Sequence, residues 1–401
     1  MRRKECRGNM RRHKSNRIIG ALTVALLGIG LIVIYMVGPM RVNVLNSAYG
    51  ASYDDNYFFV RQLINVVLAL VVFVVTFKMP YEVIKKAGKW VMLGGILLCV
   101  VLAGLALVGS GMAKCELGAC RWFNFGGLSL QPSEILKLGL VLYLAGFLAE
   151  KKKAGMLGSL TDFWVPFAVV CGVTLGLVVV VQKDLGTGAT LMAIILAMLF
   201  MSGVKMRYFL AAVGVVVLGG GVAILSSPYR MQRLMTFQSE ESSDSYHIEN
   251  AMIAIGTGGL LGVGIGNSVQ ATGYLPESIN DSVFAVMGET FGFVGLLAIV
   301  GCFTALLLQL LRTANYLADE EQSLMVIGIF AWATAHVVVN IAAMTGLMPL
   351  TGITLPLLSY GGTSMLFMAA ALGLALQLSC YTERQVRTES REQRTTRRMA
   401  A

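Results

Sequence analysis

Ten long apolar runs, separated by short polar breaks, constrain the fold of this 401-residue chain more than any other feature. A helix needs roughly 20 apolar residues to cross the hydrocarbon core of a bilayer, and the runs are close to that length. Only 13% of the residues are charged, against roughly 25% in soluble domains. The pattern therefore predicts an all-α polytopic membrane protein with about ten transmembrane helices. The runs lie near residues 18–38, 57–77, 89–109, 132–149, 163–181, 187–203, 207–226, 283–311, 323–345 and 354–378.

The distribution of Lys and Arg predicts the orientation of these helices. If the N-terminus is cytoplasmic and each run crosses once, most of the 32 Lys and Arg residues fall on the inner side, as the positive-inside rule requires. This N-in/C-in arrangement gives a basic cytoplasmic tail at 1–17, a membrane domain at 18–378 and a second basic cytoplasmic tail at 379–401. Within the membrane domain, a large extracytoplasmic loop at 227–281 separates the seventh and eighth helices.

The net charge of +10 follows mainly from this topology. We expect the basic tails to touch anionic membrane lipid, and not nucleic acid, because aromatic and base-reading motifs are absent from them. The seven cysteines show no Cys/His spacing typical of a metal site. Cys115 and Cys120 share an outer loop, and the sequence leaves open whether they form a disulfide or are a chance pair.

Function is expected on the outer face, where the long loops lie. Arg121 and Trp122 precede the fourth run there, and Trp122 suits an interfacial anchor. Glu134 and Lys137 lie three residues apart, one turn inside the same run, so helical spacing predicts that they pair. Charges inside a span cost roughly 2.5–3.5 kcal/mol each on insertion scales, which favours a functional role for this pair.

Two further polar stretches lie on the predicted outer side. In QKDLGTGAT, Asp184 is expected either to cap the sixth helix or to contact a ligand, and Lys183 either to pair with Asp184 or to meet an anion. In SPYRMQRLMTF, Arg230 and Arg233 are three residues apart. They are candidates for bidentate contacts to phosphate, and the alternative is a solvated loop face.

Acidic residues gather in YLPESINDSVFAVMGET, residues 274–290. Asn280 or Asp281 is expected to cap the eighth helix, but capping explains neither Glu277 nor Glu289, which lies two turns deeper in an apolar run. Three acids near one helix start predict a polar cavity that opens to the outside.

Four motifs together resemble the SEDS family, the polytopic peptidoglycan polymerases of shape, elongation, division and sporulation (FtsW, RodA and SpoVE). The stretch NSVQ, residues 267–270, resembles the division subfamily most. The resemblance extends from the first predicted helix to Leu378. The motifs that carry it are RWFNFGGLSLQPSEILKL, QKDLGTGAT, IGNSVQATGYLPESINDSVFAVMGET and GLMPLTGITLPLLSYGGTSML.

The resemblance implies a glycosyltransferase of the bacterial cytoplasmic membrane, acting at the division septum. Such proteins polymerise lipid II into glycan strands on the outer face, and a class B penicillin-binding protein cross-links them. Further partners would be the growing strand and other divisome membrane proteins. The family's essential acid corresponds to Asp281, which we expect to act as the base for the acceptor 4-hydroxyl. A lipid II flippase and a non-catalytic divisome scaffold are the alternative functions.

The remaining candidate residues are assigned to substrate. An inverting transfer requires cations for the leaving pyrophosphate but no enzyme nucleophile. The sequence leaves a metal open: Glu277, Asp281 and a pyrophosphate could hold a divalent cation through oxygen ligands, but no residue spacing requires one. The sequence departs from the family pattern at Lys183, Asn250 and Ser282. The candidate substrate contacts are Arg121, Glu134, Lys137, Lys183, Asp184, Arg230, Arg233 and Glu277.

Overall fold

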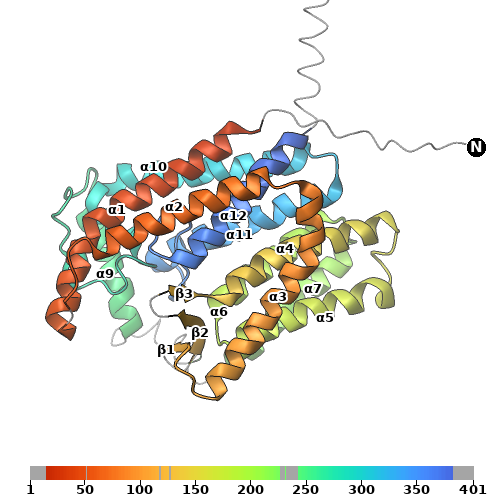
Figure 1. Ribbon diagram of the computed structural model, residues 1–401, viewed down its shortest axis with the longest axis horizontal. Coiled ribbons are helices and arrows are strands. Elements are labelled where there is room, and N and C mark those ends of the chain that lie inside the picture. The colour runs from red at the N-terminus through yellow and green to blue at the C-terminus, as the bar shows by residue number, and fades with distance from the viewer. Residues whose placement is uncertain are drawn as a thin grey trace, which may run out of the picture.

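The computed structural model describes residues 15–50, 52–116, 119–125, 128–225, 231 and 243–382. The predicted phosphate contacts Arg230 and Arg233 lie outside these residues, as does most of each basic tail. Over the described part, the chain is a bundle of helices with one small sheet (Figure 1). The helices are α1 (Arg17–Tyr49), α2 (Tyr57–Lys78), α3 (Tyr81–Leu107), α4 (Pro132–Lys153), α5 (Val165–Leu175), α6 (Leu185–Met201), α7 (Met206–Leu225), α9 (Ser243–Thr257), α10 (Val283–Tyr316), α11 (Glu320–Met344) and α12 (Gly362–Leu378).

The helices confirm the predicted polytopic membrane fold. Nine described helical segments are long and apolar enough to cross a membrane, and the shorter apolar helix α6 makes a tenth. Each predicted run corresponds to one of them. The last helix begins at Gly362 instead of residue 354, because residues 351–361 form an irregular segment that includes Pro356, and proline has no backbone N–H to donate.

Burial separates central from peripheral helices. In the most apolar 18-residue stretch of α11, 72% of residues are buried inside the protein, whereas none are in α7. The exposed side chains of α7 are large and apolar, including Leu210, Val217 and Leu225. Such a surface is stable in contact with lipid and not with water, so α4, α11 and α12 form the core around which the peripheral helices pack.

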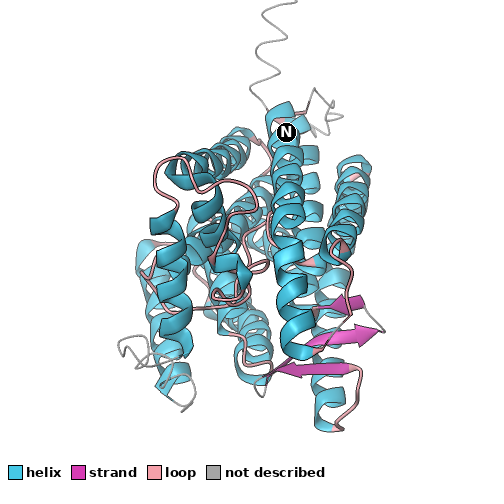
Figure 2. Cartoon of the chain, turned by 90° about the vertical axis from the view of Figure 1, so that its left-hand side faces the viewer, coloured by secondary structure: helices cyan, strands magenta, loops and turns pink. Residues whose placement is uncertain are grey.

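A three-stranded antiparallel sheet, which the sequence analysis did not predict, precedes α4. Its strands are β1 (Ala113–Glu116), β2 (Ala119–Phe125) and β3 (Leu128–Leu130), in the order β1-β2-β3. Cys115 and Cys120 are partners in the β1–β2 register and form a disulfide, which settles the alternative left open by the sequence. Figure 2 shows the sheet at the end of the bundle away from the beginning of α1.

Helix α10 is interrupted at Gly292, where the backbone has φ 67° and ψ −169°. The glycine-rich segment after α9 supplies hydrogen bonds at this break: the Val263 amide donates to the Glu289 carbonyl at 2.9 Å, and the Phe293 amide donates to the Gly259 carbonyl at 2.9 Å. Irregular backbone within a membrane protein is tolerated where protein satisfies its polar groups. The apolar, glycine-rich segment therefore packs against the bundle, beside the start of α10.

Candidate functional site

A polar cavity of about 460 Å³ lies at the end of the bundle that carries the sheet. It is formed where the sheet, the starts of α4, α6 and α12, helix α11 and the segment before α10 meet. Six of the predicted site residues line it, although they come from widely separated parts of the chain. These are Arg121, Glu134, Lys137, Asp184, Glu277 and Asp281.

Asp281 lies in a tight turn that ends where α10 begins. The Glu277 carbonyl accepts hydrogen bonds from the amides of Asn280 at 2.9 Å and Ser282 at 3.3 Å, and Glu277 has a positive φ of 47°. The predicted cap was wrong: Ser282 occupies the N-cap position and makes no side-chain capping bond. Because the Ser282 hydroxyl donates instead to the Pro276 carbonyl at 2.8 Å, the turn is closed on itself and Asp281 faces the cavity.

Two neighbouring segments hold this turn from outside. The side-chain amide of Asn340, on α11, donates to the Asp281 carbonyl at 2.7 Å and to the Ile353 carbonyl at 2.8 Å. The Tyr360 amide donates to the Ile279 carbonyl at 2.8 Å. Burial raises the pKa of the Tyr360 phenol, so this cavity-lining group stays protonated at neutral pH and is not a base.

The predicted Glu134–Lys137 pair is confirmed and extends to two further residues, His336 and Trp332. The Lys137 ammonium donates to Glu134 Oε1 at 2.9 Å, lies 3.1 Å from His336 Nε2 and sits over the Trp332 ring at 4.9 Å. His336 Nδ1 lies 3.2 Å from the Thr354 carbonyl, which only a protonated Nδ1 can satisfy, so Nε2 accepts from Lys137. Lys137 is 1% exposed, and its charge is thus held on the cavity wall by three partners.

Glu134 retains capacity for a ligand. Its second carboxylate oxygen, Oε2, is buried and has no hydrogen-bond partner within the described parts of the chain. Leaving a buried acceptor unsatisfied costs about 1–3 kcal/mol, and more for a charged group. A donor from a bound molecule or water in the cavity would remove that cost.

The sheet brings basic groups to the opposite wall. Arg121 and Trp122 on β2 line the cavity together with Lys114 on β1, a residue that the sequence analysis did not single out. Arg121 Nη2 donates to the Lys183 carbonyl at 2.8 Å, and its buried Nε has no hydrogen-bond partner among the residues described here. Arg121 is therefore fixed at one nitrogen and has donors left for an anion.

Asp184 caps α6, which confirms one of its two predicted roles. Its carboxylate accepts from the Thr187 amide at 3.0 Å, from the Thr187 hydroxyl at 2.8 Å and from Gln131 at 3.3 Å. Both oxygens are thus engaged by the protein, and a ligand contact stays a prediction. Lys183 has a positive φ of 54° and does not belong to the cavity lining; its carbonyl positions Arg121.

Glu289 does not join the other two acids in the cavity, contrary to the prediction of three acids at one mouth. It is 2% exposed, and its carboxylate accepts from the Ser268 hydroxyl at 2.5 Å and from the Val269 amide at 2.9 Å. The break in α10 and the packing of residues 263–270 on it decide this position. Glu289 therefore stabilises the loop of residues 263–270. Glu277 is exposed, and its Oε1 lies 3.6 Å from Arg41 Nη2.

A metal ion has no complete protein site in the described residues, which contain no group of three or more His, Cys, Asp or Glu side chains suited to hold one. Glu277 and Asp281 do line the same cavity. Two carboxylates would need oxygen ligands from elsewhere to complete the coordination of Mg²⁺ or Ca²⁺. A divalent cation shared with a phosphorylated substrate fits this donor set.

Sequence reasoning missed Lys114, Asn340 and the site role of His336. Lys114 sits in a strand of a hairpin that apolar periodicity does not reveal. Asn340 and His336 are both polar residues in an apolar run and lie four positions apart, one turn of helix. That spacing was the available signal that one face of α11 meets a polar region.

The profile of the FtsW/RodA/SpoVE family, described as cell cycle proteins, matches residues 17–384. Among similar proteins, stage V sporulation protein E of Bacillus subtilis is 34% identical over 370 residues, which cover 90% of this chain and 96% of that protein. The probable peptidoglycan glycosyltransferase FtsW of Coxiella burnetii is 33% identical over 369 residues, covering 90% of this chain and 95% of the relative.

Solved structures share the fold. A chain of a peptidoglycan synthase complex, solved to explain the coordination of polymerization and crosslinking, aligns with a TM-score of 0.71 at 24% identity and covers 91% of this chain and 97% of its own. The rod shape determining protein RodA of Thermus thermophilus aligns with a TM-score of 0.64 at 25% identity, covering 91% and 96%.

Proposed function

Because this chain belongs to the FtsW/RodA/SpoVE family of cell cycle proteins, we propose that it is a peptidoglycan glycosyltransferase that polymerises lipid II into β-1,4-linked glycan strands. The reaction takes place on the outer face of the bacterial cytoplasmic membrane, during cell division. The observation that carries the proposal is the cavity in which Asp281 lies with Arg121, Lys114 and Lys137. A carboxylate with several cations is the combination that transfer from a pyrophosphate requires.

The proposed reaction is a single inverting displacement. The 4-hydroxyl oxygen of the acceptor sugar attacks the anomeric carbon of the growing strand, and the bond from that carbon to the pyrophosphate oxygen breaks. The hydroxyl proton passes to the Asp281 carboxylate as the new bond forms, because a hydroxyl is too weak an acid to ionise beforehand. A positioned base of this kind contributes about 10²–10⁴-fold. The fixed turn of residues 276–282 supports this role, because the carbonyl of Asp281 is held by Asn340.

The departing pyrophosphate carries negative charge that the cavity can stabilise. Arg121 has unused guanidinium donors, and planar guanidinium groups bind phosphate oxygens bidentately. Lys137 is already paired with Glu134, so we assign it a smaller share of the phosphate charge. Lys114 enters the cavity from the neighbouring strand and is a further candidate. Glu277, at the exposed rim, is placed to accept hydrogen bonds from sugar hydroxyls or to share a divalent cation.

The partner that fits this function is a class B penicillin-binding protein, which would cross-link the strands that this chain polymerises. A similar chain occurs in a solved peptidoglycan synthase complex that coordinates polymerization and crosslinking, and this similarity supports such an association. Relatives named FtsW support a place among the membrane proteins of the division septum. The apolar outer surface of the peripheral helices, as on α7, leaves room for a transmembrane partner.

The decisive experiment compares the wild type with Asp281→Asn. Purified full-length protein and its penicillin-binding partner would be supplied with labelled lipid II, and glycan products would be resolved by length. We expect Asp281→Asn to lose at least about 100-fold in polymerisation rate with unchanged expression and partner binding. The matched control is Asp55→Asn, an exposed carboxylate in the α1–α2 connection, outside the cavity.

The outcomes separate the candidate functions. If Asp281→Asn makes polymer at the wild-type rate, Asp281 is not the general base. If wild-type protein moves labelled lipid II across a vesicle membrane but makes no glycan, the chain is a flippase. If it does neither but still binds its partner, it is a scaffold.

A further inference from the structure

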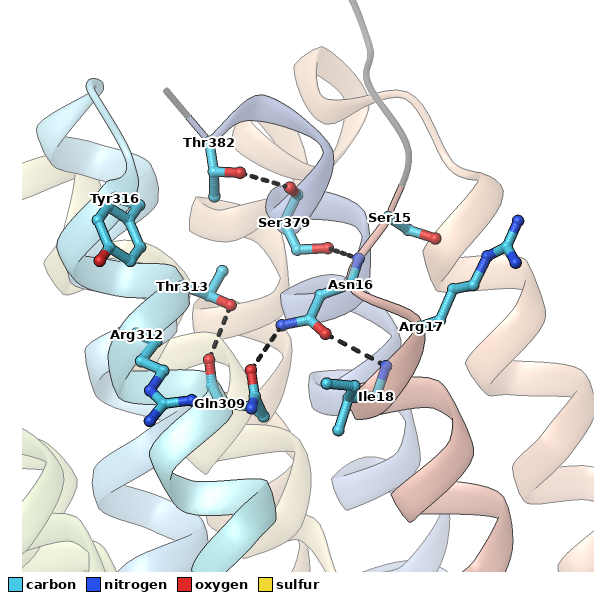
Figure 3. Close-up of a pocket in the computed structure, with 10 residues that line it drawn as sticks. All are labelled: Ser15, Asn16, Arg17, Ile18, Gln309, Arg312, Thr313, Tyr316, Ser379 and Thr382. Atoms are coloured by element: carbon cyan, nitrogen blue, oxygen red, sulfur yellow. Dashed lines mark hydrogen bonds between the residues drawn. The ribbon is translucent and has the colours of Figure 1, made fainter. Parts of the chain in front are cut away.

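A second cavity of about 460 Å³ lies at the other end of the bundle, and the proposed function does not use it. Figure 3 shows how the beginning of α1, the last turns of α10 and the end of α12 enclose it. By the positive-inside rule this end faces the cytoplasm. Its lining consists of Ser15, Asn16, Arg17, Ile18, Gln309, Arg312, Thr313, Tyr316, Ser379 and Thr382.

Among the described residues, the lining has two cations, Arg17 and Arg312, and no carboxylate. Arg17 and Arg312 are both exposed, and neither forms an ion pair within the described ranges. Figure 3 places them on opposite sides of Asn16, with the Arg17 side chain directed away from Gln309 and Arg312. Each guanidinium group can bind phosphate oxygens bidentately.

Other basic side chains at this end of the bundle have acidic partners. The α10–α11 connection and the start of α11 carry three consecutive acids, and each has a lysine within reach: Lys153 lies 4.0 Å from Asp319, Lys152 pairs with Glu320, and Lys85 lies 2.5 Å from Glu321. Lysines of α3 and α4 are therefore matched by acids on α11. Arg17 and Arg312 are left with capacity for an anion that the described chain does not supply.

Hydrogen bonds between the enclosing segments keep the cavity in shape. The Asn16 side-chain amide donates to Gln309 Oε1 at 3.0 Å, and the Asn16 backbone amide donates to the Ser379 hydroxyl at 2.9 Å. The hydroxyls of Thr313, Ser379 and Thr382 donate to backbone carbonyls of their own segments. These polar groups are thus engaged with the protein itself, and the guanidinium groups of Arg17 and Arg312 keep donors for an anion.

We propose that this cavity binds the phosphate group of an anionic phospholipid of the inner leaflet. The cavity lies at the ends of helices that are long and apolar enough to span a membrane, next to exposed apolar side chains such as Ile18. The cytoplasmic leaflet carries negative surface charge that attracts basic segments close to the membrane. A bound headgroup would hold the beginning of α1 against α10 and the end of α12, and would stabilise their packing.

The test measures which lipid the full-length protein retains. Protein in nanodiscs of mixed phosphatidylglycerol and phosphatidylcholine would be released into detergent, and bound lipids counted by native mass spectrometry. We expect wild type to retain phosphatidylglycerol in preference, and Arg17→Gln/Arg312→Gln to bind it at least about tenfold more weakly. Arg17→Lys/Arg312→Lys should bind with intermediate affinity, because lysine keeps the charge but not the bidentate geometry.

The matched control is Arg207→Gln, which removes an exposed arginine at the start of α7, outside this cavity. Equal loss of phosphatidylglycerol in the control, or no loss in the double variant, would overturn the proposal, since general attraction to basic helix ends would then explain the binding. A parallel titration with inorganic phosphate distinguishes the source of the anion. Phosphate bound by wild type but not by the double variant, without any lipid preference, would replace the lipid by a soluble ligand.

Discussion

The side-chain amide of Asn340 donates a hydrogen bond to the backbone carbonyl of Asp281 at 2.7 Å, and a second to the Ile353 carbonyl at 2.8 Å. One buried residue on α11 therefore joins the turn that carries the proposed base to the irregular segment before α12. Both segments line the outer cavity. The position of Asp281 depends on a contact between residues 59 positions apart in sequence.

Replacing Asn340 by Ala should slow polymerisation more than it weakens substrate binding. Two buried carbonyls would lose their donor, at a cost of about 1–3 kcal/mol each, and the turn would be less fixed. We expect kcat to fall about tenfold or more, with KM for lipid II changed much less. Asn267→Ala is the control, since Asn267 also donates to a backbone carbonyl but lies outside the cavity. A wild-type kcat for Asn340→Ala would show that Asp281 is held by the turn alone.

Lys137 has a structural role in its pair with Glu134 and a proposed chemical role, and two variants can separate the two. Lys137→Met leaves the Glu134 carboxylate buried without its cation, and breaking a buried pair in this way costs about 3–5 kcal/mol. Glu134→Gln/Lys137→Met removes both charges, so we expect thermal stability to recover. Glycan synthesis should stay low if Lys137 contacts the pyrophosphate. Recovery of both stability and synthesis in the double variant would make the pair purely structural.

Arg121→Lys should raise KM for lipid II about tenfold or more, because lysine offers one ammonium where arginine offers a planar fork. Arg121→Ala should do so further and also lose the bond to the Lys183 carbonyl. Steady-state kinetics over a range of lipid II concentrations measure both effects. If wild type and Arg121→Lys have equal kcat and KM, only a positive charge is needed at this position of the cavity.

The Cys115–Cys120 disulfide staples the hairpin that carries Lys114 and Arg121 into the cavity. Cys115→Ser/Cys120→Ser should therefore weaken lipid II binding, measured as a higher KM, while the helical bundle unfolds at nearly the same temperature. A reductant should lower wild-type activity and leave the double variant unaffected. Cys302→Ser, which removes a free cysteine on α10, should behave as wild type. If a reductant also lowers the activity of the double variant, the loss of activity comes from a group other than this disulfide.

Gly292→Ala should destabilise the protein strongly. A Cβ there would lie 2.3 Å from the Gly262 amide nitrogen, and the backbone φ of 67° is one that side chains rarely adopt. Gly301→Ala, further along the same helix with nothing within 4 Å of its Cβ, should be neutral or slightly stabilising, since alanine favours helix by about 1 kcal/mol. The yield of folded protein after detergent extraction measures the difference. Similar yields would show that the α10 break tolerates a side chain.

Much of the outer site could be anticipated from single stretches of sequence. Asp184 as a helix cap and Glu134 with Lys137 as a pair both follow from spacing within one segment, because such contacts need only a local helix. Glu277 and Asp281 were also correctly predicted to lie at a polar cavity, because they stand just before an apolar run. The expected cap at Asn280 or Asp281 was wrong because the turn closes through the Glu277 carbonyl and Ser282 instead.

The sequence by itself determined the polytopic helical architecture, since hydropathy acts over one segment at a time, and its resemblance to a known family indicated the candidate base. Only the tertiary structure decided that Glu289 serves a loop and not the cavity, that His336 joins Lys137, and that a disulfide-linked hairpin brings Lys114 beside Arg121. Each of these depends on contacts between residues distant in the chain. No local pattern encodes them, because they form only when the helices pack and the buried polar groups of one segment are satisfied by another.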